Sequence, residues 1–163
     1  YDSSIVIGSS KGTRVVSMED FHIGYLKNAL QPGEMVTEVR VPVPPTRTGG
    51  GFHKFERTAA DLPLVNVAAR VTLNRKGECE QARIAVGAAT AAGIPVRAGA
   101  AENLLTGRKP DDGLILEASQ AAGTIECVND FRASSELRSR WVSCGAEEAL
   151  KKAFAQAREE TQA

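Results

Sequence analysis

The first forty residues alternate apolar and polar positions in the way that strands do. The stretch SIVIGSSKGTRVVSM, residues 4–18, has two short apolar runs on either side of a turn at Lys11 and Gly12, which predicts a β-hairpin. A short irregular or helical piece follows, for which Ser17 is a suitable N-cap. The stretch EMVTEVRVPVP, residues 34–44, then predicts a strand that ends at its prolines.

The stretch VPVPPTRTGGG, residues 41–51, has the composition of a linker. Prolines cannot join a sheet ladder, and we expect the three glycines, Gly49–Gly51, to loosen the chain. We therefore place a domain boundary at about Thr46, between a domain of residues 1–46 and a domain of residues 47–163.

Beyond this boundary the pattern predicts three strands and then three helices. The strands are expected over residues 52–57, 64–74 and 81–88, and they are antiparallel because their connections are too short for a crossover helix. Helical spacing begins near residues 97, 110 and 134. This order predicts an α+β fold, in which about three helices pack on a three-stranded antiparallel sheet. The apolar face of the last helix is expected to comprise Leu137, Trp141, Cys144, Leu150, Phe154 and Ala157.

Composition narrows the class of protein. Lys and Arg total 20, as do Asp and Glu, so no basic excess favours nucleic acid or a membrane surface. Cys79, Cys127 and Cys144 lie far apart, which does not suit a disulfide framework, a zinc site or an iron–sulfur site. No secretory signal is visible, and we expect a cytoplasmic location and inert thiols. Because the sequence starts Tyr-Asp-Ser-Ser-Ile, without methionine, we expect it to be part of a longer protein.

Few motifs point to a particular chemistry. The sequence has neither GxGxxG nor GxxxxGK[ST], and GSSKGTR, residues 8–14, is a weak phosphate-loop candidate because no helix is expected after it. His22 and His53 have no partners at metal-ligand spacing, so we assign no metal ligand. No Ser/His/Asp set can be assembled, and we assign no catalytic residue.

Lys54, Arg57 and Asp61 stand out because they lie immediately before a long apolar strand. They have two interpretations. In the first, these side chains form ion pairs at a strand edge, which contribute little to stability. In the second, the strand holds Lys54 against an anionic or electron-rich ligand, whose negative charge the lysine stabilises.

Four segments, taken in order, resemble one known family. The sequence resembles the FAD-binding subunits of the molybdenum hydroxylases, the family of xanthine dehydrogenase and carbon monoxide dehydrogenase. The last segment is similar to the pattern D-x-R-x-S-x-x-Y/L-R at the start of that family's final helix, with Leu137 where tyrosine is frequent. The segments are GTRVVSMEDFHIGYLKNALQPGEMVTEVRVP (12–42), GGFHKFERTAADLPLVNVAARV (50–71), ARIAVGAATAAGIPVRAGAAENLLTG (82–107) and VNDFRASSELRSRWV (128–142).

The resemblance implies an organisation and a function. Residues 1–46 would be the tail of an α+β FAD-binding domain, and residues 47–163 the flavoprotein C-terminal α+β domain. The complete protein would be an FAD-dependent oxidoreductase subunit that passes electrons from iron–sulfur clusters through FAD to NAD or another acceptor. Its partners would be the molybdenum-cofactor subunit and the iron–sulfur subunit of the same complex. The substrate would be chosen on the molybdenum subunit.

The resemblance also carries four positions over to the cofactor. Lys54 and Val36 would contact the flavin, and Asp61 and Leu62 would lie in the segment that turns beside its ring, whereas Arg57 is expected only to form an ion pair. The family's glycine-rich loops for the FAD pyrophosphate would lie before Tyr1. The chain alone is therefore expected to be inactive and to bind FAD weakly or not at all. The alternative is a non-catalytic α+β module that docks partner subunits.

Overall fold

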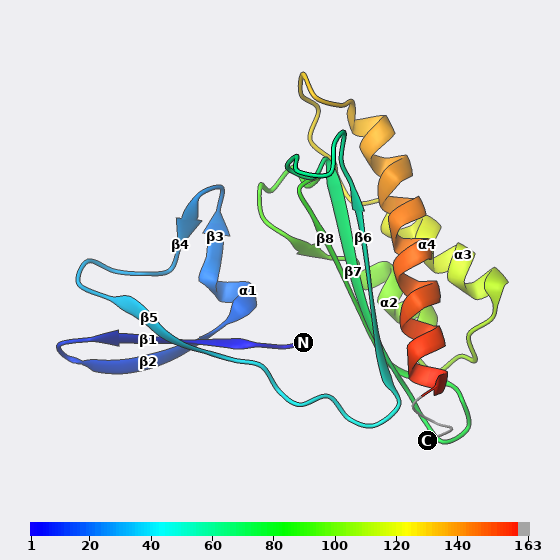
Figure 1. Ribbon diagram of the computed structural model, residues 1–163, viewed down its shortest axis with the longest axis horizontal. Helices are drawn as coiled ribbons and strands as arrows, with labels where there is room; N and C mark the ends of the chain where they lie inside the picture. The colour runs from blue at the N-terminus through cyan, green and yellow to red at the C-terminus, as the bar shows by residue number, and fades with distance from the viewer. Residues whose placement is uncertain (160–163) are drawn as a thin grey trace. The chain divides into compact units, whose positions relative to one another are not determined.

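The computed structural model describes residues 1–159, which divide into two compact units. The first unit is Tyr1–Pro44, and the second begins at Pro45. Each unit is built on its own antiparallel sheet (Figure 1). None of the helices within residues 1–159 is long and apolar enough to cross a membrane.

The first unit is a three-stranded antiparallel sheet with a small hairpin beside it. The predicted hairpin is confirmed as β1 (Ser4–Ser9) and β2 (Gly12–Ser17), and β5 (Met35–Arg40) pairs with the other edge of β1. Its buried apolar side chains are those of the central strand, Ile5, Val6 and Ile7. Ser17 caps the one-turn helix α1 (Met18–Phe21) by accepting a hydrogen bond from the Asp20 amide at 3.0 Å, and β3 (His22–Gly24) and β4 (Lys27–Asn28) follow.

An ion pair holds the loop before β5 against β2. The Arg14 guanidinium donates to both carboxylate oxygens of Glu34 at 2.8 Å and to the carbonyl of Ala29 at 2.7 Å. Glu34 also accepts a hydrogen bond from the Gln31 amide at 2.7 Å. The bonds from Arg14, followed by the bond from the Gln31 amide, lower the pKa of Glu34 to about 2.

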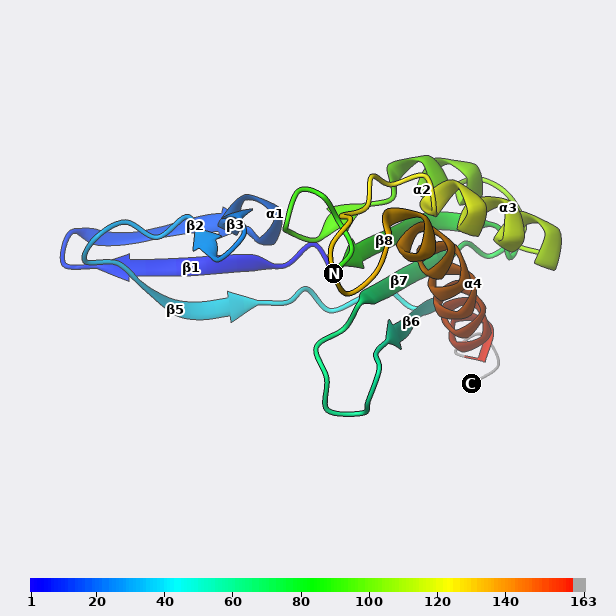
Figure 2. The same cartoon turned by 90° about the horizontal axis from the view of Figure 1, so that it is seen from above.

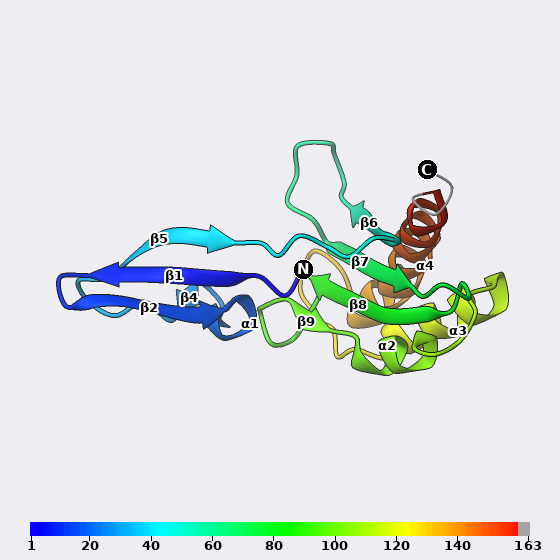
Figure 3. The same ribbon diagram turned by 90° about the horizontal axis from the view of Figure 1, so that it is seen from below.

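The second unit is a sheet with helices on one face (Figures 2 and 3). Its strands β6 (Thr48–Phe55), β7 (Val65–Leu73) and β8 (Cys79–Gly87) form the predicted antiparallel meander. A two-residue strand, β9 (Val96–Arg97), adds to the edge of β8. The predicted α+β fold is confirmed, with helices α2 (Gly99–Leu105), α3 (Asp112–Ala122) and α4 (Ser135–Glu159).

The core of this unit lies between the sheet and the helices α2, α3 and α4. Alternate residues of β7, among them Val65, Val67 and Val71, are fully buried, as the period-2 pattern of a half-covered sheet requires. Leu137 is 39% exposed and Cys144 is exposed, so their assignment to the inward face of the last helix was wrong. Much of the face of α4 that packs on the sheet consists of alanines. A prediction based on large apolar side chains does not detect such a face. The buried residues of α4 are Arg138, Val142, Gly145, Ala146, Ala149, Leu150, Ala153, Phe154 and Ala157.

The glycines Gly49–Gly51 do not loosen a linker, contrary to the expectation from composition. They lie inside β6, which begins at Thr48, and α4 passes directly over two of them. A Cβ atom on Gly49 would lie 1.9 Å from the carbonyl oxygen of Ala153, and one on Gly51 would lie 1.9 Å from that of Ala149. Strand and helix are therefore in backbone contact, and glycine is required because a side chain has no room.

We predict that Gly51→Ala lowers the free energy of unfolding by about 3 kcal/mol, because the added methyl group forces the helix and the strand apart. Urea denaturation, followed by the fluorescence of the single tryptophan, Trp141, measures the change. Gly99→Ala is the matched control, since nothing lies within 4 Å of a Cβ at that position. Equal stability of the Gly51 variant and its parent would show that the contact yields easily.

A second prediction concerns the stability that Glu34 contributes at low pH. The pKa of Glu34 in the folded state, about 2, lies below its ordinary value of 4.5, so this group stabilises the fold above pH 4.5 and the stabilisation is lost as the pH falls toward 2. Glu34→Gln should therefore be less stable than the parent at neutral pH, and the difference should shrink across that window. Thermal denaturation at several pH values measures it. Glu38→Gln, at a pair whose side chains are half exposed, should change less; a difference that persists undiminished at pH 2 would contradict the assignment.

Candidate functional site

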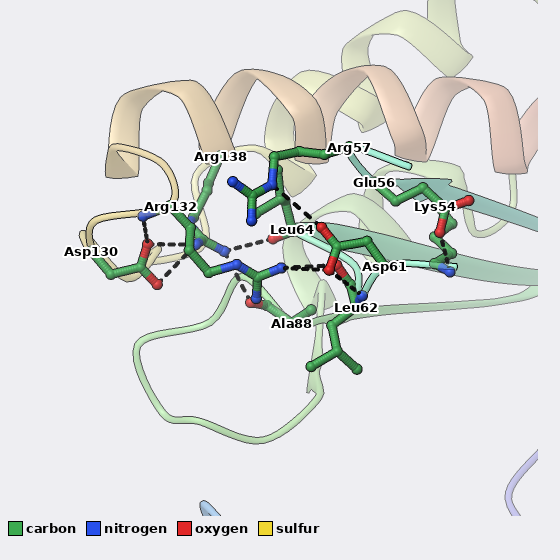
Figure 4. Close-up of polar contacts among 10 residues, drawn as sticks. All are labelled: Lys54, Glu56, Arg57, Asp61, Leu62, Leu64, Ala88, Asp130, Arg132 and Arg138. Atoms are coloured by element: carbon green, nitrogen blue, oxygen red, sulfur yellow. Dashed lines mark hydrogen bonds and ion pairs between the residues drawn. The ribbon is translucent and has the colours of Figure 1, made fainter. Parts of the chain in front are cut away.

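Lys54 lies near the end of β6, on the face of the sheet that the helices do not cover. Its ammonium group forms an ion pair with Glu56, two residues further along the same side of the strand (Figure 4). Phe55, between them, faces the opposite way and stacks on Trp141 of α4, with ring centroids 5.7 Å apart. Packing on α4 thus fixes the backbone at Phe55, and this places the Lys54 side chain away from the helices.

Asp61 organises the exposed segment that follows β6. Its carboxylate accepts hydrogen bonds from the Leu62 amide at 2.8 Å and from Arg57 Nε at 3.3 Å, so the ion pair expected of Arg57 is present. The Asp61 amide donates to the carbonyl of Thr58 at 2.9 Å, which closes a turn. The bond from the Leu62 amide, and then Arg57 and Arg132, lower the pKa of Asp61, which therefore remains ionised at neutral pH.

Arg132 links this segment to the chain just before α4. Its Nη2 donates to the carbonyl oxygen of Leu62 at 2.9 Å and lies 3.8 Å from Asp61 Oδ1. The Leu62 side chain points away from these charges and is 72% exposed (Figure 4). One arginine therefore contacts both the backbone and the carboxylate of the segment.

Arg138, on the first turn of α4, is a buried charge with many acceptors. Its side chain is 1% exposed, and Nη1 donates to the carbonyl oxygens of Leu64 at 2.6 Å and Ala88 at 3.1 Å. Nη2 donates to both carboxylate oxygens of Asp130, at 2.9 Å and 3.0 Å. These bonds compensate for the removal of the guanidinium from water. They also join three loops at one end of the sheet.

Asp130 connects the two arginines. Its Oδ1 accepts from the amides of Arg132 at 2.9 Å and Ala133 at 3.1 Å, in addition to Arg138. The bond from the Arg132 amide is the largest of the influences that lower the Asp130 pKa. Ser134 completes the turn as the helix cap, accepting from the Leu137 amide at 3.2 Å. The D-x-R-x-S-x-x-L-R pattern is thus a turn stabilised by hydrogen bonds, followed by a helix cap and a buried arginine.

The residues assigned to the cofactor from the sequence fall in two places. Lys54, Asp61 and Leu62 lie at one end of the sheet of the second unit (Figure 4). Val36 belongs to the first unit, where it lies in β5 and is 36% exposed. Sequence reasoning missed the contribution of Arg132 and Arg138. The signal was present in the spacing of Asp130, Arg132 and Arg138, but a charge at the start of a helix is usually solvated.

The cysteines and histidines do not assemble a second site. No group of three or more His, Cys, Asp or Glu side chains within residues 1–159 is arranged to hold a metal ion. Burial raises the pKa of the Cys79 thiol to about 11, so this thiol is protonated at neutral pH. His53 lies on the face of β6 opposite Lys54, with its ring 4.6 Å from that of Phe55.

A cationic cavity lies at the opposite end of the same sheet. Its volume is about 360 Å³, and it includes residues that precede β6 and that join β7 to β8. None of the residues assigned to the cofactor lines it, so it is separate from the candidate site. The lining residues are Arg47, Leu73, Asn74, Arg75, Lys76, Gly77, Lys109 and Arg158.

Comparison with known proteins identifies relatives of both units. The family model of the CO dehydrogenase flavoprotein C-terminal domain matches residues 51–157, and that of the FAD binding domain in molybdopterin dehydrogenase matches residues 1–44. Subunit alpha of the 6-hydroxypseudooxynicotine dehydrogenase complex of Paenarthrobacter nicotinovorans is 30% identical over 96% of this chain and 53% of its own length. The carbon monoxide dehydrogenase medium chain of Afipia carboxidovorans is 30% identical over 91% of this chain and 51% of its own length.

Solved structures agree with these matches. A chain of quinoline 2-oxidoreductase from Pseudomonas putida 86 superposes with a TM-score of 0.86 at 29% identity, covering 96% of this chain and 53% of that one. A chain of CO dehydrogenase from Oligotropha carboxidovorans superposes with a TM-score of 0.85 at 26% identity, covering 95% of this chain and 54% of that one. The chain thus spans about half the length of the relatives it matches.

We predict that Arg138→Met lowers the free energy of unfolding by about 3 kcal/mol, because it removes the buried donor to the carbonyl oxygens of Leu64 and Ala88 and breaks the ion pair with Asp130. Arg140→Ala, at an exposed position on the same helix, should change it by less than about 0.5 kcal/mol. Urea denaturation of both variants measures the difference. Similar losses for the two arginines would refute the importance of the buried network.

Proposed function

Because the chain belongs to the CO dehydrogenase flavoprotein family, the FAD-binding subunits of molybdenum hydroxylases, we propose that it forms part of such a subunit. Residues 1–46 are the tail of the FAD-binding domain, and residues 47–163 are the C-terminal domain. The observation that carries this proposal is the match of two family models to consecutive parts of the chain, in the order in which the two domains occur.

The complete protein is proposed to be an FAD-dependent oxidoreductase subunit located in the cytoplasm. It receives electrons from iron–sulfur clusters, which a molybdenum-cofactor subunit reduces, and passes them through FAD to NAD or another acceptor. Its partners are the molybdenum-cofactor subunit and the iron–sulfur subunit. An assembly of this kind is supported by the relative from Paenarthrobacter nicotinovorans, which is subunit alpha of the 6-hydroxypseudooxynicotine dehydrogenase complex.

The chemistry of the side chains near the end of β6 suits the ring of a flavin. FAD, when bound, supplies two-electron redox chemistry, and its ring gains negative charge on reduction. The Lys54 ammonium can stabilise that charge, and the exposed apolar side chain of Leu62 can lie against the ring. Asp61, held ionised by its donors, fixes the turn that presents Leu62. In the first unit, Val36 offers an exposed apolar side chain to the same cofactor.

The Lys54–Glu56 ion pair tunes this effect. Glu56 neutralises part of the lysine charge, and both side chains are about two-thirds buried or more. A partly desolvated pair interacts more strongly with a nearby charge than an exposed one does. The net electrostatic effect on the flavin ring is therefore set by both residues. Removing Lys54 weakens the stabilisation of negative charge on the ring, whereas removing the charge of Glu56 strengthens it.

The anchoring of the cofactor is proposed to depend on residues outside this chain. The glycine-containing stretch at residues 8–14 forms the hairpin between β1 and β2 and leads into a strand, so it offers no helix N-terminus to a pyrophosphate. We propose that this chain by itself is inactive and holds FAD weakly.

A docking function for partner subunits is a second candidate. Phe131 is 96% exposed and lies next to Arg132, on the loop before α4. Exposed apolar side chains of this size are common at interfaces. This function is compatible with contact to the flavin, because Phe131 is not among the residues assigned to the cofactor.

We predict that Lys54→Ala, in the complete FAD-loaded subunit, lowers the two-electron midpoint potential of the flavin by roughly 30 mV, which corresponds to about 1.4 kcal/mol. The reason is the loss of a cation that favours the reduced ring. Glu56→Gln should raise the potential by freeing the lysine charge, and Lys54→Arg should retain most of the parent value. A dye-coupled redox titration measures all three. Unchanged potential, FAD content and re-oxidation rate in Lys54→Ala would reject the proposed contact.

A further inference from the structure

The segment of residues 57–62 has local bonds of its own but needs an external contact to hold its position. Its internal bonds are those of Asp61 with Arg57, with the Leu62 amide and with the carbonyl of Thr58. These close a turn, yet they do not determine where the turn lies. Residues 57–60 are exposed, so packing against a core does not determine it either.

Arg132 supplies that contact. The bond to the Leu62 carbonyl acts on the backbone itself, and the ion pair with Asp61 acts on the side chain one residue earlier. The Arg132 side chain is only 21% exposed, which limits its own freedom. Two attachments to adjacent residues restrain both the position and the orientation of the turn.

Arg132 is itself tied to the body of the second unit. Its amide donates to Asp130, whose carboxylate pairs with the buried Arg138, and Arg138 binds the carbonyl of Leu64, two residues after the segment. The C-terminal end of the segment is therefore restrained at Leu62 and just beyond it at Leu64 by one connected set of bonds. Because each of these residues has more than one partner, the buried Arg138 helps to fix the position of Arg132, and Arg132 in turn fixes the position of the segment.

We infer that Arg132 is a positioning residue, which holds Asp61 and Leu62 in place toward the flavin; this inference rests on the proposed function. Arg132 does not touch the cofactor in this account. It acts through Leu62, whose carbonyl it binds while the apolar side chain points away from it (Figure 4).

Arg57 provides a matched control. It pairs with the same Asp61 carboxylate, at 3.3 Å, and carries the same charge. However, it lies within the segment and its hydrogen bond to Asp61 stays inside it. Loss of Arg57 removes a cation from Asp61 but leaves the Leu62 carbonyl bound. Loss of Arg132 removes a cation from Asp61 and also releases the Leu62 carbonyl. A purely electrostatic effect would make the two variants alike.

The first experiment measures amide hydrogen exchange in the full chain without added cofactor. In Arg132→Ala, the amides of Asp61 and Leu62 should exchange roughly tenfold faster than in the parent, as expected for loss of a charged hydrogen bond. Arg57→Ala should change them less, and Arg132→Lys should restore part of the protection because a lysine can still donate to the carbonyl. Unchanged exchange in Arg132→Ala would overturn the inference.

The second experiment records the visible absorption and fluorescence of the complete FAD-loaded subunit. We expect Arg132→Ala to alter the flavin spectrum and Arg132→Lys to return it toward that of the parent, with the melting temperature little changed. If exchange quickens in Arg132→Ala while the spectrum stays that of the parent, the inference is wrong. In that case the Lys54 variants decide separately whether the proposed function stands, because their effect on potential does not depend on Arg132.

Discussion

The buried guanidinium of Arg138 is the interaction on which the candidate site depends. Removing a charge from water is costly, and here two carbonyl oxygens and a carboxylate compensate for it. The requirement for acceptors determines the backbone of three loops. Ala88 illustrates this, because it adopts a positive φ of 62°, which is unfavourable for a residue with a side chain, while its carbonyl accepts from Arg138.

The position of Arg138 follows in turn from the way α4 lies on β6. Gly49 and Gly51 let the helix backbone come into contact with the strand, and Gly145 faces Val67 and Phe55 at 3.1 Å and 3.2 Å from its would-be Cβ. A glycine that costs about 1 kcal/mol of helix propensity is thus used for close packing. With the helix axis fixed along β6, its first turn reaches the loops at the end of the sheet. The packing of α4 on β6 therefore determines where Arg138 lies among the loops at the end of the sheet.

Local sequence patterns predicted much of the fold. The features that they did not predict depend on contacts between residues far apart in the sequence. The hairpin at residues 4–17, the meander and the Ser17 cap depend on neighbouring residues, so the sequence reveals them. The glycines of β6 were misread because the same residue serves a loose linker and a tight contact, and only the helix above them distinguishes the two. The grouping of Lys54, Asp61 and Leu62 could be expected from their spacing, but their proposed contact with FAD came from resemblance to a family. Arg132 and Arg138 were missed because their partners are distant in the chain.

The most direct test is a crystal structure of the complete subunit with FAD bound. We predict that the flavin ring lies against Lys54 and the side chain of Leu62, with the bond from Arg132 to the Leu62 carbonyl intact. A ring that contacts none of residues 54–62, for example one bound at the cationic end of the sheet that includes Arg47 and Lys109, would contradict it.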